Sequence, residues 1–354
     1  MRNLVHRLNT SSSSSRSLEP GKTRASSVAL SAALSASLFI ALASLAATLS
    51  SCAGTETSAR SAVAVSNVAP HYDTPPLYRV SGGQGANLVL LGTIHLGPDS
   101  GWTLSPEATQ AIEEASTIVM ELDPRQITEE AVSNLIANTV MLDSPTTLVS
   151  VLRPETAKVL EEMDATVTAM GLPPHVRRYM KPWFVSVGLI ESATTATDYK
   201  AAQAVEQLIM AMLGQRPLIP LETFQEQLGI FDDMPLPLQD YMLYDTLTRL
   251  DETEEGIEML IQAWRVSDVA ALEAVAREGI EELPQLEPFY QRLLDDRNRN
   301  WRGQLRPLLE DPKRKGQTIL VAVGALHLVG PNSVGSLLAE SGYRLDEISQ
   351  TKTK

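Results

Sequence analysis

The sequence contains a single cysteine, Cys52, and only five histidines among its 354 residues. One cysteine excludes an internal disulfide bond and any zinc site built from several cysteines of one chain. Basic residues are also in the minority, with 29 Lys and Arg against 43 Asp and Glu, so the formal net charge is −14. Binding to nucleic acid needs a basic face, so this balance argues against nucleic acid as the main partner. The chain also lacks a Walker phosphate loop, a GxGxxG motif after a strand and a GxSxG motif.

The position of Cys52 makes this lone cysteine informative. It follows five basic residues and then an apolar stretch over residues 28–49. This order is typical of an export signal, which we expect over residues 1–51. The segment LSSC, residues 49–52, resembles a bacterial lipobox, in which the cysteine is lipidated and becomes the mature N-terminus. Two alternatives stay open: an uncleaved membrane anchor, and a signal cut after Ser51 without lipid.

The rest of the chain begins and ends with similar patterns. Residues 52–76 have the composition of a flexible tether. From residue 77, two strands joined by a glycine-rich turn are followed by a helix with Ser105 as its N-cap and by a strand at residues 117–123. The C-terminal end again predicts strand, helix and strand.

Between these two ends, residues from about 126 to 316 predict a large helical insertion, with one short strand at residues 216–223. We therefore expect one α/β domain over residues 77–354. Its mixed or parallel sheet would be assembled from the N-terminal and C-terminal strand-helix-strand units.

Two apolar runs at opposite ends of the chain place a histidine in the same way. LVLLGTIHLG contains His95 and LVAVGALHLV contains His327, each three residues after a glycine. If both runs are strands, alternation puts each histidine on the same side as the residue two positions before it, Thr93 or Ala325.

The carboxyl ends of neighbouring parallel strands form one edge where ligands gather. His95 and His327 could converge there, joined by Glu121 and Glu222 near other strand ends. Two imidazoles and one or two carboxylates suit Mn, Fe, Co or Zn. The ordinary alternative is that each histidine is a hydrogen-bonded polar group with no ligand.

Several motifs together resemble one known family. The segments GTIH, VMELD, KPW, LETFQEQL, RNRNW and GALHLVG occur in this order over residues 77–348. Their combination is similar to the TraB/GumN family, which includes pheromone-shutdown proteins. That family is related to the Tiki metalloproteases and to the erythromycin-esterase/ChaN-like fold.

The resemblance implies a metal-dependent, peptidase-like centre. Its metal ligands would be His95, His327 and Glu121, completed by Arg297 and Asn298. Arg299 and Asn300 repeat the same dipeptide, so the choice of the first pair rests on the resemblance. An ordinary intrahelical ion pair is the alternative explanation for the arginine.

Glu222 matches a further carboxylate of the family and is our candidate for the base that activates water, with Arg297 stabilising the oxyanion. Glu121 and Glu222 could exchange roles. Thr223 and Glu226 have the spacing of a helix capping box, which explains them without chemistry.

These observations favour an exported, membrane-anchored lipoprotein that hydrolyses a peptide or protein substrate with a divalent ion. Two other functions stay open. One is a metal-independent hydrolase with a histidine as general base. The other is a binding lipoprotein without catalysis, which sequesters a peptide signal or haem.

Overall fold

The computed structural model describes residues 71–128, 130, 133 and 139–351. The expected export signal, Cys52 and most of the expected tether lie outside the described residues. The packed chain begins at Asp73, which is buried and accepts a hydrogen bond of 2.7 Å from Nε of Arg265. Residues 74–76 are buried as well. In the described ranges, no helix has both the length and the apolar character needed to cross a membrane.

Within the described residues, six strands form one mixed sheet in the order β6-β4-β7-β2-β1-β8. Neighbours among β6, β4, β7 and β2 are parallel, whereas β1 pairs antiparallel with both β2 and β8. A separate ribbon pairs β3 with β5. The strands are β1 (Leu77–Ser81), β2 (Asn87–Thr93), β3 (Gly97–Pro98), β4 (Thr117–Met120), β5 (Tyr199–Lys200), β6 (Leu218–Pro220), β7 (Thr318–Gly324) and β8 (Arg344–Glu347).

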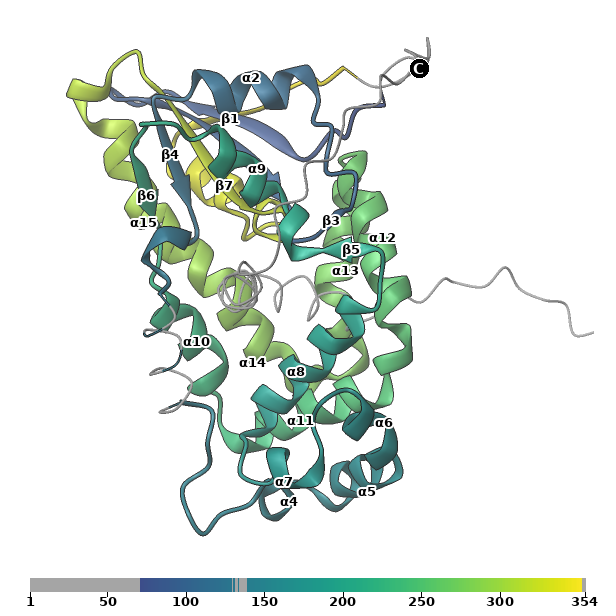
Figure 1. The fold of residues 1–354 in the computed structure, drawn as a ribbon. Coiled ribbons are helices and arrows are strands. Elements are labelled where there is room, and N and C mark those ends of the chain that lie inside the picture. The colour runs from purple at the N-terminus through teal and green to yellow at the C-terminus, as the bar shows by residue number, and fades with distance from the viewer. Residues whose placement is uncertain (1–70, 129, 131–132, 134–138, 352–354) are drawn as a thin grey trace, which may run out of the picture.

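The two ends of the chain meet at the centre of this sheet. Strand β7 lies between β4 and β2, so a C-terminal strand completes a sheet begun by N-terminal ones (Figure 1). The prediction of a mixed α/β sheet assembled from both ends is confirmed. Gly92 pairs with Val323 and Thr93 with Gly324, so the two similar runs lie side by side with an offset of one residue.

Helices cover both faces of the sheet because alternate strand residues are apolar on both sides. In β2, Val89 and Leu91 pack in the core that includes α2 (Pro106–Glu114), α9 (Val205–Met212) and α12 (Thr253–Arg265). The intervening residues pack in the core of the opposite face, against α15 (Arg297–Glu310) and α16 (Val334–Glu340). The sheet is thus the middle layer of three.

The remaining helices lie between β4 and β6 and between β6 and β7, and they extend away from the sheet as a helical body (Figure 1). Its far part has an apolar core of its own. The chain before β7 contains a π-helical turn, η5 (Gln291–Asp296), directly before α15. The other α-helices whose bounds the described residues give are α4 (Leu148–Val151), α5 (Pro154–Glu162), α6 (Asp164–Ala169), α7 (Pro174–Arg177), α8 (Pro182–Thr195), α10 (Phe224–Asp232), α11 (Leu236–Thr248), α13 (Val269–Glu282) and α14 (Glu287–Tyr290).

Local signals in the sequence explain where two of these helices begin. Ser105 caps α2, with its Oγ accepting a hydrogen bond of 3.1 Å from the N–H of Ala108. Thr223 and Glu226 form the expected capping box at the start of α10. This box places α10 directly after Glu222, at the end of β6.

Candidate functional site

Each of the four parallel strands delivers one ionisable side chain to the same edge of the sheet. Glu121 directly follows β4, and Glu222 follows β6 by two residues. His95 follows β2, and His327 follows β7. All four side chains are buried. The carboxyl-terminal edge of the parallel strands therefore holds a cluster of two imidazoles and two carboxylates.

The two histidines leave their strands differently. Strand β2 ends at Thr93, two residues before His95, whereas β7 continues into a turn of 3-10 helix, η7 (Ala325–Leu328), that contains His327. The expected strand alternation therefore does not extend to either histidine. The apolar residues around His327 resemble a continued strand in the sequence, but the chain turns at Gly324. The turn brings His327 back over the end of the sheet.

The three residues His95, Glu121 and His327 surround Gly324. A Cβ atom added to this glycine would lie 3.5 Å from Nε2 of His95, 3.3 Å from Oε1 of Glu121 and 3.6 Å from Cδ2 of His327. The amide of Gly324 also donates a hydrogen bond of 2.7 Å to Oε1 of Glu121. A glycine at this position leaves room for the convergence of the three side chains.

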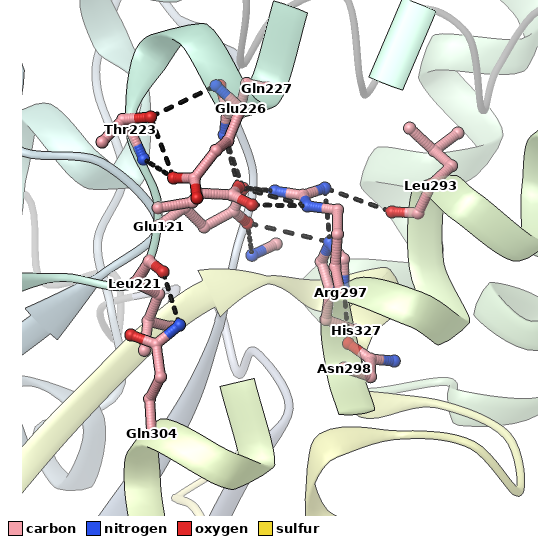
Figure 2. A network of polar contacts seen from close by, with 12 residues as sticks. Glu121, Leu221, Thr223, Glu226, Gln227, Leu293, Arg297, Asn298, Gln304 and His327 are labelled. Carbon is pink, nitrogen blue, oxygen red and sulfur yellow. Dashed lines mark hydrogen bonds and ion pairs between the residues drawn. The ribbon is translucent and has the colours of Figure 1, made fainter. Parts of the chain in front are cut away.

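Arg297, the first residue of α15, joins the cluster from the facing helix. Its Nη2 donates to Glu121 Oε2 at 2.6 Å and also contacts Glu222. Its Nε lies 3.1 Å from both carboxylate oxygens of Glu222, and its Nη1 lies 3.1 Å from His327 Nε2. Figure 2 shows the guanidinium pointing at Glu121 and His327. One buried arginine therefore bridges both carboxylates and one imidazole.

Asn298 holds His327 from the other side of the ring. Its Oδ1 lies 2.7 Å from His327 Nδ1, while its Nδ2 donates to the carbonyl of Asn332 at 2.9 Å. The second bond fixes the amide orientation, so the oxygen faces the imidazole and Nδ1 carries the proton. Nε2 of His327 then presents its lone pair to Arg297. Asn298 thus positions a histidine and lies away from the carboxylates.

His95 is held in a comparable way by Glu206, a residue on α9 that the sequence analysis did not single out. Glu206 Oε1 lies 2.9 Å from His95 Nδ1, and both side chains are buried. The ion pair lies on the Nδ1 side of the ring, and Nε2 lies on the side of Gly324. The sequence feature that could have indicated Glu206 is its place as a single acidic residue at the start of an apolar helix.

Gln227 on α10 is a second residue that the sequence analysis missed. Its Nε2 donates to Glu222 Oε1 at 2.9 Å and to Glu121 Oε2 at 3.3 Å. It therefore braces the two carboxylates beside Arg297. Its position in LETFQEQL, five residues after Glu222 and directly after Glu226 of the capping box, was a usable signal.

Burial and neighbouring charges set the protonation of the cluster. Burial alone would raise the pKa of Glu121, but Arg297 and the two histidines lower it to about 2. Burial, reinforced by Arg297, lowers the pKa of His327 to about 3. At neutral pH the site therefore holds an ionised Glu121 beside a neutral His327.

The other two groups shift upward. Burial raises the pKa of Glu222, although Arg297 opposes this rise. For His95, burial acts to lower the pKa, but Glu206 and Glu121 together outweigh it and raise the value. A raised carboxylate pKa makes Glu222 a better proton acceptor near neutrality than an exposed glutamate.

The donor types of this cluster fit a divalent ion, and their arrangement puts Arg297 in competition with it. Each histidine is held at Nδ1 by an acceptor, which is the usual outer support of a metal-ligating imidazole. However, the guanidinium contacts Glu121 and His327 Nε2, so an ion bound there would compete with Arg297 for the same electron pairs. Among the described residues, no group of three or more His, Cys, Asp or Glu side chains has the geometry of a metal site.

Two of the spaces that adjoin the cluster lie on different sides of it. A groove of about 890 Å³ reaches Glu222 and Arg297 and runs along α10 and η5. A small cavity of about 30 Å³ lies on the histidine side and is lined by Thr93, His95 and Gly324, among others. A molecule in the groove therefore meets Glu222 and Arg297 first, with the histidines behind them.

Comparison with known proteins identifies the family. No curated protein and no solved structure is significantly similar to the chain. The model of the TraB/PrgY/gumN family matches residues 76–347, a range that runs from the first strand of the sheet to the last and includes every residue of the cluster. The chain therefore belongs to the TraB/PrgY/gumN family.

Proposed function

We propose that the protein is an exported hydrolase that cleaves a peptide bond with the help of a divalent ion. The observation that carries the proposal is the convergence of His95, Glu121, Glu222 and His327 at one sheet edge, each from a different parallel strand. A packed sheet edge has no structural need for four buried ionisable groups, because each is costly to desolvate. Their concentration beside a groove favours a catalytic centre.

His95, His327 and Glu121 are the candidate ligands, with Mn, Co, Fe or Zn as the candidate ions. Such an ion supplies positive charge that polarises a peptide carbonyl and makes a water molecule more acidic. Glu222 lines the groove and would accept the proton of the attacking water. Arg297 lines the same groove, and its fixed positive charge would stabilise the oxyanion.

We further propose that the protein works at a membrane surface outside the cytoplasm. The support is the sequence before the described residues: a basic segment, an apolar stretch and the lipobox-like residues 49–52. A lipid on Cys52 would anchor the folded domain through a tether. The substrate would then be a peptide or protein reached at that surface.

Hydrolysis of a mixture of synthetic peptides by the full-length protein tests this function. We expect cleavage products by mass spectrometry, their loss with a chelator and their return with added Mn²⁺ or Co²⁺. His95→Ala should abolish cleavage, while His175→Ala, which changes an exposed histidine of α7, should leave it unchanged. Cleavage that resists the chelator would favour the metal-independent hydrolase. Retention of peptides without cleavage would favour a binding protein.

A further inference from the structure

Glu206 is an isolated acidic group at the buried start of helix α9. The helix reads VEQLIMAM, and the neighbours Val205 and Ile209 are fully buried in the main core. Glu206 itself is only 6% exposed. A carboxylate in such surroundings is unfavourable unless a polar partner compensates for its lost hydration. The partner in the structure is His95, at 2.9 Å.

The backbone holds Glu206 and His95 together from both directions. The amide of Val205 donates a hydrogen bond of 3.1 Å to the carbonyl of Ile94, so the residues preceding the two side chains are directly joined. After His95, strand β3 pairs with β5, which lies shortly before α9. At Gly97 a Cβ atom would lie only 2.0 Å from the carbonyl oxygen of Gln203, so the two segments approach closely there.

The two motif histidines are therefore supported by chemically different partners. Asn298 offers His327 a neutral amide oxygen, whereas Glu206 offers His95 a carboxylate. Both acceptors lie on the Nδ1 side of their ring. Nε2 of His95 therefore lies on the side of Gly324, and Nε2 of His327 faces Arg297. A carboxylate partner fixes the ring orientation and also makes the imidazole a stronger electron-pair donor at Nε2.

We propose that Glu206 is a positioning residue of the site, holding His95 with its proton on Nδ1 and its Nε2 lone pair on the side of Gly324. This role rests on the proposed function, because the lone pair matters only if Nε2 acts on an ion or a substrate. Glu206 contacts no reacting group itself. It lies outside every motif of the sequence analysis and acts through His95 alone.

Nitrogen NMR of histidine side chains in the full-length protein tests the role without any substrate. In alkaline buffer, the wild-type spectrum should show the His95 proton on Nδ1 and an unprotonated Nε2. Glu206→Leu should abolish this preference, and Glu206→Gln should restore it, because the glutamine oxygen still accepts a hydrogen bond. A wild-type spectrum with the proton on Nε2 would overturn the proposal, whether or not the leucine variant folds.

Binding of Co²⁺ alone supplies a second measurement. We expect Glu206→Leu to weaken Co²⁺ binding about 10- to 100-fold, with most of the affinity recovered in Glu206→Gln. The matched control is Asp240→Asn on α11. It also removes a buried carboxylate, which in this case is paired with Arg153, and the variant should bind Co²⁺ as the wild type does. Wild-type affinity in Glu206→Leu would overturn the role of Glu206. Failure of the wild type to bind Co²⁺ would instead overturn the metal centre, and the NMR result would then decide the role alone.

Discussion

Arg297 is the residue on which the polar cluster depends. It is buried, and it forms ion pairs with both Glu121 and Glu222. Removing one partner from a buried ion pair leaves the other charge without compensation, which is far more damaging than the loss of an exposed pair. The neighbouring Arg299 has the same sequence context but pairs with Asp296 at the surface.

This difference predicts the outcome of two arginine substitutions. We expect Arg297→Ala to lower the free energy of unfolding by about 3–5 kcal/mol, because two buried carboxylates lose their counter-ion. Arg299→Ala should change it by no more than about 0.5 kcal/mol. Urea unfolding of the two variants beside the wild type measures both values. Equal losses would contradict the placement of Arg297 in the cluster.

The two motif histidines should influence stability with opposite dependence on pH. His327 has a pKa of about 3 in the fold against 6.5 in the unfolded chain, so as the pH falls the unfolded chain takes up the proton first. The stability contributed by neutral His327 is complete above pH 6.5 and is lost between pH 6.5 and 3. His95 has a raised pKa, so its contribution is present below pH 6.5 and is lost as the pH rises through its pKa in the fold.

Substitution of each histidine should therefore change the slope of stability against pH in opposite directions. Between pH 6.5 and 4.5, His327→Gln should lose less stability than the wild type, by up to about 1.4 kcal/mol per pH unit. Above pH 6.5, His95→Gln should lack the fall in stability that deprotonation of His95 causes in the wild type as the pH rises. Urea unfolding at a series of pH values gives the slopes. Parallel slopes for the two variants would show that their environments do not differ as described.

Strand β2 and the turn η7 must approach closely for the two histidines to meet. At Gly92 in β2, a Cβ atom would lie 3.1 Å from Cα of Ala325 in η7 and 3.2 Å from Cβ of Pro76. The first neighbour is backbone and the second belongs to the ring of a buried proline, so neither can move without shifting its segment. Close packing therefore explains why the first GxxH motif has a glycine at position 92, without reference to catalysis.

A pair of glycine substitutions tests this close approach. Gly92→Ala should lower stability by about 1–3 kcal/mol through overpacking, and it should reduce cleavage because η7 carries His327. Gly303→Ala lies in the interior of α15, where an added Cβ would have no described neighbour within 4 Å apart from the adjoining residues and backbone of its own helix. It should raise stability by about 0.5–1 kcal/mol through helix propensity. Thermal unfolding of both variants separates the two effects, and a stabilising Gly92→Ala would contradict the packing.

The overall architecture could be predicted from the sequence because its signals are local and regular. The apolar runs, the glycine-rich turn and the cap at Ser105 each specify an element without reference to the rest of the chain. The likeness of the two histidine runs also predicted that distant segments lie together. The offset of one residue between them could not be predicted, because register depends on packing across both faces of the sheet.

The candidate site could be predicted only in part from the sequence, because some of its residues come from helices. Residues at strand ends share one edge by topology, so His95 and Glu121 could be grouped from their positions alone. Glu206 and Gln227 come from helices, and the direction of a helical side chain depends on how that helix docks. The bridging role of Arg297 likewise follows from the placement of α15, which no local pattern specifies. The turn at Gly324 could not be predicted either, because the residues on both sides of it are apolar and resemble one continuous strand.

The folded chain as a whole makes one site from segments that are more than 200 residues apart in the sequence. Strand β7 fills the centre of the sheet, between two strands from the N-terminal part, and brings His327 to His95. Neither end of the chain can build the cluster alone. The central claim is therefore that the two GxxH motifs act as a single ion-binding centre.

Elemental analysis of the purified full-length protein tests this claim most directly. We predict about one equivalent of a divalent metal in the wild type and in His175→Ala. The double variant His95→Ala/His327→Ala should contain none. Each single variant should lose most of the metal, because each motif supplies one ligand of the same centre. Equal metal content in the wild type and the double variant, or no metal in any of the proteins after growth in metal-supplemented medium, would contradict the account.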